Sequence, residues 1–89
     1  MNPTTEQKLV EIQQWVNARK RKNITTNPVA KELLQRRNTM LEEIQQMLNV
    51  IQSKSNEEPS RQTNRGQAVI NEYLRLRTEI IHIETIIGD

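Results

Sequence analysis

The chain has 89 residues, with 13 Lys+Arg against 11 Asp+Glu, one Trp, one Tyr and no Cys. This length forms one small domain, and a hydrophobic share of 34% is below the roughly 45–50% of ordinary globular domains, so we expect a thin core that gains from a partner. The small net charge of +2 and a strong apolar periodicity argue against a disordered polyelectrolyte. The lack of Cys excludes disulfides, thiolate nucleophiles and cysteine-ligated zinc.

Targeting signals are missing from the N-terminal part of the sequence. Lys8, Glu11, Arg19 and Lys20 interrupt the apolar run that a secretory signal needs. Nowhere does an apolar run approach the roughly 18 residues of a membrane span. We therefore expect one cytoplasmic domain, over residues 1–89.

A first helix is predicted over residues 4–22. Its apolar residues recur three and four apart and therefore share one face; they are Leu9, Val10, Ile12, Trp15 and Val16. Asn2-Pro3 offers an N-cap followed by proline at the first helical position, and Asn23 is a plausible stop.

A second helix is predicted over residues 28–53, opened by Asn27-Pro28. Its heptad seam carries leucines at position a, isoleucines at d and further apolar residues at g; the seam is Leu33, Leu34, Met40, Leu41, Ile44, Met47, Leu48 and Ile51. Arg37 occupies a d position, where it would either extend past the seam to water or mark the end of a partner helix. Ala30, at the preceding d position, favours close approach.

Residues 54–64 contain no apolar residue and are predicted to form a polar linker. Asn64 and Gln67 have the spacing of a capping box, which places the start of the last helix near Arg65. Pro59 could open an extra turn earlier, but Gly66 inside a helix would cost about 1 kcal/mol relative to Ala, which favours the later start.

A third helix is predicted over residues 65–87, ended by Gly88. Its heptad seam consists of Val69, Tyr73, Leu76, Ile80, Ile83 and Ile87. A second stripe, Ile70, Leu74 and Ile81, flanks that seam, so the helix is apolar over more of its circumference than one neighbour requires. It should therefore be central in the fold or buried in an oligomer.

Two nine-residue segments, 9–17 and 41–49, resemble one another at an offset of 32 residues. The similarity favours either a duplicated helix or two helices drawn from the same Leu, Ile, Glu and Gln alphabet. It does not extend into the loops or the third helix, which favours shared composition.

These elements predict an all-α fold. The expected architecture is a three-helix bundle built on a long antiparallel hairpin, with the shorter N-terminal helix covering it. At about 1.5 Å per residue, the two long helices would reach about 35 Å. Such an elongated rod has a high surface-to-volume ratio, and we expect it to oligomerise.

The sequence carries no pattern typical of catalysis. His82 is the only histidine and lies opposite the seam of its helix, so it cannot build a histidine metal site. The adjacent pairs Glu42-Glu43 and Glu57-Glu58 point about 100° apart if helical and do not converge on one atom. We therefore predict a protein that is not an enzyme and that has no cofactor, metal or small-molecule substrate.

Arg19-Lys20-Arg21-Lys22 is the sharpest charged feature of the sequence. Four cations on one helical turn could bind nucleic-acid phosphates, or they could complement the dipole at the end of the first helix and keep a loop soluble. Trp15 and Tyr73 lie on apolar seams, which places them in the core rather than on a surface where bases could stack.

The leading prediction is a small helical protein–protein interaction module: an oligomeric adaptor, an assembly subunit or a small chaperone. Its partner would be a second copy or another helical protein, packed on an apolar stripe. The predicted partner-binding residues are Ile70, Leu74, Ile81, Met40 and Met47, the methionines supplying adaptable packing. The alternative is a dimeric nucleic-acid-binding regulator that uses Arg19, Lys20, Arg21 and Lys22.

Overall fold

The computed structural model of the chain describes residues 3–19, 27–54 and 58–88. These residues form three helices and no strand: α1 (Pro3–Arg19), α2 (Pro28–Ser53) and α3 (Pro59–Ile87). The predicted all-α class is therefore confirmed. Residues 20–22, the predicted end of the first helix, lie outside the described part of the chain, as do Asn2 and Asn23.

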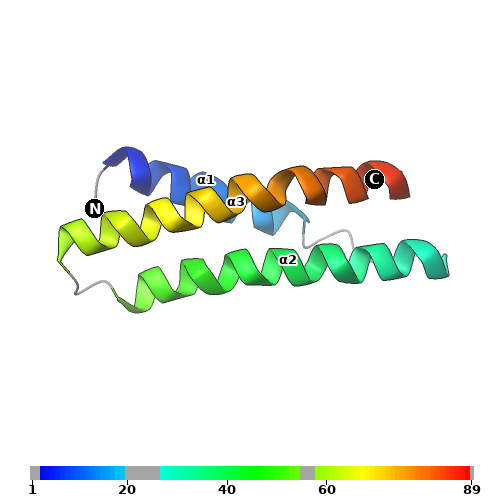
Figure 1. The fold of residues 1–89 in the computed structure, drawn as a ribbon, viewed down its shortest axis with the longest axis horizontal. Coiled ribbons are helices and arrows are strands. Elements are labelled where there is room, and N and C mark those ends of the chain that lie inside the picture. The colour runs from blue at the N-terminus through cyan, green and yellow to red at the C-terminus, as the bar shows by residue number, and fades with distance from the viewer. Residues whose placement is uncertain (1–2, 20–26, 55–57, 89) are drawn as a thin grey trace.

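The three helices pack against one another, each touching the other two. Figure 1 shows α2 and α3 side by side and running in opposite directions, with α1 lying along the pair and running in the direction of α3. The molecule measures 47 × 20 × 16 Å. Its long axis follows the helices. Each helix therefore has one face on the core and the opposite face in water.

The start of α2 and the end of α3 follow the sequence signals. The side-chain oxygen of Asn27 accepts hydrogen bonds from the backbone N–H groups of Val29 (3.0 Å) and Ala30 (3.4 Å), and Pro28 occupies the first turn. Gly88 has a φ of 77°, in the left-handed region, and its N–H donates to the carbonyls of Glu84 and Thr85. Asn27-Pro28 and Gly88 are thus confirmed as start and stop signals.

The third helix begins at Pro59, six residues before the predicted start, so the prediction of a linker through residue 64 was wrong. Proline is preorganised for the first helical turn, and the N–H of Gln62 donates to the carbonyl of Glu58 (3.1 Å). Gly66 is buried, so its intrinsic cost is offset by packing. The expected capping box is not formed, because Gln67 donates to Asn71 one turn further on (3.1 Å).

The core lies along the predicted seams, and Val16, Ile44 and Ile80 at its centre are fully buried. The second stripe of α3 has an explanation within the chain. Because α3 contacts both α1 and α2, it needs an apolar surface wider than one neighbour would cover. Ile70, the first residue of that stripe, belongs to the common core.

Segments 9–17 and 41–49 occupy equivalent environments. At all nine paired positions the two residues have the same degree of burial, from Leu9 and Leu41 in the core to Asn17 and Asn49 at the surface. Gln13 and Gln45, one such pair, donate to each other's side-chain oxygens (2.7 and 3.0 Å), and each lies beside the Asn four residues on in its own helix. The two segments therefore occupy similar environments and meet through a reciprocal glutamine pair, which spacing alone did not predict.

Candidate functional site

The interior holds one charged centre that joins all three helices. Arg37 of α2 is 0% exposed, and its guanidinium forms an ion pair with Glu84 of α3 (3.1 Å). The other carboxylate oxygen of Glu84 pairs with Arg19 of α1 (3.2 Å). A second nitrogen of Arg37 donates to the backbone carbonyl of Arg19 (3.1 Å). Arg37 does not extend past the seam to water, because a carboxylate 47 residues away neutralises it inside the bundle. The other alternative, that Arg37 marks the end of a partner helix, agrees with its contact to Arg19, the last residue of α1.

Arg37 also stabilises the last turn of α1. The carbonyl of Arg19 is the final one of that helix, where the macrodipole is negative and the carbonyl groups have no partner within the helix. The guanidinium of Arg37, from another helix, both donates to the Arg19 carbonyl and places a positive charge at the negative end of α1. The C-terminal end of α1 is therefore fixed by tertiary contacts with α2 and α3.

The aromatic pair extends this centre toward the middle of the bundle. The guanidinium of Arg19 lies 3.8 Å from the ring centroid of Trp15, a cation–π geometry. Trp15 meets Tyr73 edge to face, with centroids 5.2 Å apart. Both rings pack against the core, as predicted. Arg19 is thus engaged within the chain, whereas Lys20, Arg21 and Lys22 lie outside the described residues, so a nucleic-acid role for this run stays a prediction.

The five predicted partner-binding residues do not form one surface. Ile70 and Met40 are buried in the common core of the bundle, so neither is exposed to a partner. Leu74 is 57% exposed, and Ile81 and Met47 are half-buried. Met47 lines a hollow with Ala68 of α3. Leu74 lies about 120° around α3 from Ala68, so Met47 and Leu74 lie on different sides of α3.

A groove of about 570 Å³ lies between the N-terminal half of α1 and the C-terminal end of α2. Its lining is apolar at the floor and rich in amides at the rim, and consists of Glu6, Leu9, Val10, Gln13, Gln14, Leu48, Ile51, Gln52 and Gln62. Val10 is 55% exposed, because it lies about 120° from Val16, the most buried residue of α1. This groove was not predicted because Val10 was placed on the core face, although its angular offset from Val16 follows from the residue spacing.

Groups that could support chemistry are dispersed over the described residues. No cluster of three or more His, Cys, Asp or Glu side chains that could hold a metal ion occurs among them. His82 is exposed, as predicted. Within the same described ranges, none of the helices is both long and apolar enough to cross a bilayer.

Comparison with known proteins gives no relative: no family model matches the chain, and neither a curated protein nor a solved structure shows significant similarity to it.

Proposed function

We propose that this protein is a small helical protein–protein interaction module, an adaptor or assembly subunit that binds an amphipathic helix of another protein in the groove between α1 and α2. The observation that carries the proposal is the groove's composition. Leu9, Val10, Leu48 and Ile51 provide an apolar floor, and glutamines provide most of the rim. Such a groove suits side chains at positions i, i+3, i+4 and i+7 of a helix.

The chemistry of the rim favours a helix over a small polar ligand. Among the described residues that line the groove, Glu6 alone is ionisable, so those residues offer a charged metabolite no convergent set of partners. Glutamine side chains can donate to and accept from the polar flank of a bound helix. Glu6, at one end, favours a partner with a Lys or Arg at the matching end.

The test is a selection of binders from a displayed library of random 16-residue peptides. We expect enriched peptides to carry apolar residues at helical spacing and to bind at least tenfold more weakly to Val10→Asp. Val10 is more than half exposed, so the variant should keep its circular dichroism spectrum and melting temperature. Val29→Asp changes another exposed valine, which does not line the groove; it is the matched control and should bind the peptides normally.

Two results would overturn the proposal. One is a selection that enriches no helical pattern. The other is a set of peptides that bind Val10→Asp as tightly as the original chain, because those peptides would occupy a different surface.

A further inference from the structure

A line of four exposed residues follows the outer side of α2, away from α1. Val29, Arg36, Glu43 and Val50 are seven residues apart and all exposed, so they lie on one gently drifting face of the helix. The order of their side chains is apolar, cationic, anionic, apolar. A second copy of this line, laid antiparallel, places each valine on a valine and each arginine on a glutamate.

α3 extends the same face with a matching order. Glu79 forms an ion pair with Arg36 (3.5 Å). Because α2 and α3 are antiparallel, moving seven residues back along α2 and seven residues forward along α3 places Ile86 beside Val29. Ile86 and Val29 are both among the large apolar side chains left exposed. This end of the face is therefore apolar.

The other end of the face is also apolar. Met47 and Val50 of α2 line a hollow with Ala68 of α3, next to a second hollow formed with Glu43 and Glu72. Exposed valine and alanine beside a half-buried methionine leave this hollow open to a further apolar side chain.

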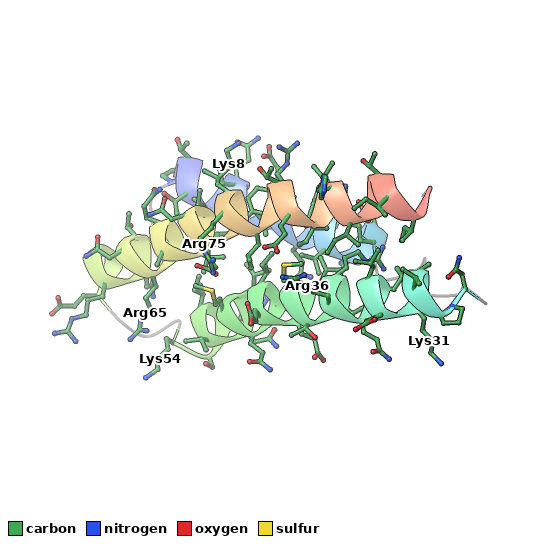
Figure 2. All side chains as sticks on the ribbon, turned by 45° about the vertical axis from the view of Figure 1, so that its right-hand side comes forward. Lys8, Lys31, Arg36, Lys54, Arg65 and Arg75 are labelled. Carbon is green, nitrogen blue, oxygen red and sulfur yellow. The ribbon has the colours of Figure 1, made fainter. Side chains whose placement is uncertain are left out.

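The charges lie between the two apolar ends. Figure 2 shows Arg36 and Arg75 in the strip between the ribbons of α2 and α3. A hydrogen bond from Arg75 to Glu72 raises the pKa of Arg75, and the charges of Glu43 and Glu79 act in the same direction. Arg36 of α2 thus lies beside Glu79 of α3, and Glu43 of α2 lies near Arg75 of α3.

We propose that this outer α2–α3 face, defined by Val29, Arg36, Glu43 and Val50 with Arg75 and Glu79, binds the same face of a second copy in antiparallel orientation. A twofold axis perpendicular to the helices, midway between Arg36 and Glu43, brings Arg36 onto the partner's Glu43. The Arg36–Glu79 contact places this axis within about 2 Å of the midpoint of residues 75 and 79, about which Ala68 and Ile86 are also symmetric. The same axis therefore brings Glu79 toward the partner's Arg75. Both helices therefore satisfy one symmetry operation.

A second copy fits this face better than an unrelated protein. Only self-recognition requires that the spacing and the charge order be symmetric about one point, and both helices meet that requirement. The line spans about 32 Å and the molecule is 20 Å wide, so each copy can bury about 600 Å². A total of about 1,200 Å² is at the low end of stable interfaces. We expect a dissociation constant on the order of micromolar.

The proposal is independent of the groove between α1 and α2, which uses none of these residues. Its test is the mass in solution by sedimentation equilibrium over about 1–500 μM protein, a range that brackets a micromolar constant. The original chain should shift from 10.5 kDa toward twice that mass. Arg36→Glu and Glu43→Arg should each weaken self-association at least tenfold, because like charges then meet across the axis.

The decisive experiment mixes the two variants. Arg36→Glu presents two anions and Glu43→Arg presents two cations, so each repels itself but complements the other. An equimolar mixture should form a heterodimer at concentrations where either variant alone is monomeric. Glu42→Arg, the same change one residue away on an exposed face pointing about 100° elsewhere, is the matched control and should dimerise normally.

Three outcomes overturn the proposal: an original chain that stays monomeric at the highest concentration, charge variants that associate no better mixed than alone, or a dimer that both variants leave unchanged. The last result would place a dimer on another surface, such as the flank of Leu74. Thermal unfolding of each variant shows whether it is still folded, so that a lower mass in solution can be attributed to weaker self-association. Peptide binding by Arg36→Glu should remain normal, which separates this proposal from the function of the groove.

Discussion

Replacing Glu84 with Gln should destabilise the bundle far more than any exposed charge change. Arg37 is completely buried, and Glu84 retains 14% of its side-chain exposure, so the substitution leaves a cation in the core without its counter-charge. Removal of one partner from a buried ion pair costs about 3–5 kcal/mol. The glutamine oxygen still accepts a hydrogen bond, and Arg37 keeps the carbonyl of Arg19 and the side chain of Asn38. We therefore expect about 3 kcal/mol.

The size of this effect is measurable against the stability of the whole chain. A domain of this length unfolds with about 4–13 kcal/mol, and with a urea dependence of about 1–1.5 kcal/mol per molar the midpoint should fall by about 2–3 M. The matched control is Glu79→Gln on the same helix. Its partner Arg36 lies 3.5 Å away and both side chains are exposed, so the expected cost is below about 0.5 kcal/mol.

The double variant Arg37→Met with Glu84→Met distinguishes a lost charge pair from lost packing. Removing both charges ends the uncompensated burial of Arg37, so part of the stability lost in Glu84→Gln should return. The return is partial because Arg19 loses its carboxylate partner and the donor to its carbonyl. Circular dichroism at 222 nm during urea unfolding measures all four proteins. A cost for Glu84→Gln no larger than that for Glu79→Gln would refute the reasoning, because it would mean that Arg37 reaches water when its partner is removed.

Three further predictions concern other parts of the chain. Asn27→Ala removes an N-cap that accepts two backbone hydrogen bonds, and should lower the unfolding free energy by about 1 kcal/mol, whereas Asn27→Ser should restore most of it in the same urea titration. Gln13→Leu leaves the amide of Gln45 without its reciprocal partner and should cost about 1 kcal/mol; Gln13→Leu with Gln45→Leu should be near neutral, and a double variant worse than the single one would contradict this account. Changing residues 20–22 to glutamine should affect neither self-association nor peptide binding; fluorescence anisotropy with a DNA duplex would instead support the nucleic-acid alternative if the original chain bound with steep salt dependence and the variant did not.

The helices and their core faces could be predicted because they depend on local spacing. The heptad seams of α2 and α3, the cap at Asn27 and the stop at Gly88 are short-range signals, and the structure places each where the sequence indicated. The start of α3 could not be located in the same way. Residues 59–64 contain no apolar side chain, and their helical state depends on Pro59 and on the packing around Gly66.

The parts of the site that were missed depend on contacts between distant residues. Arg37 at a core position indicated an irregularity, but only the fold shows that Glu84 and the end of α1 meet it there. Ile70 and Met40 were predicted to bind a partner because an apolar stripe does not reveal whether its neighbour belongs to the same chain. Both residues belong to the core of this chain, whereas the exposed apolar side chains of the described helices are Val10, Val29, Val50, Leu74 and Ile86.

The contact between Arg37 and the last carbonyl of α1 predicts an order of assembly. We expect α2 and α3 to pair first, because Arg37 and Glu84 form their ion pair only when those two helices are packed together. An isolated helix of 17 residues is marginal in water. We therefore expect α1 to gain its stability by packing on α2 and α3 and binding the Arg37–Glu84 ion pair. Opening should follow the reverse path, with α1 leaving as a unit before the other two separate. Backbone amides of α1 should therefore exchange with deuterium sooner than those at the centre of α2. The groove between α1 and α2 would exist only while α1 is packed against α2.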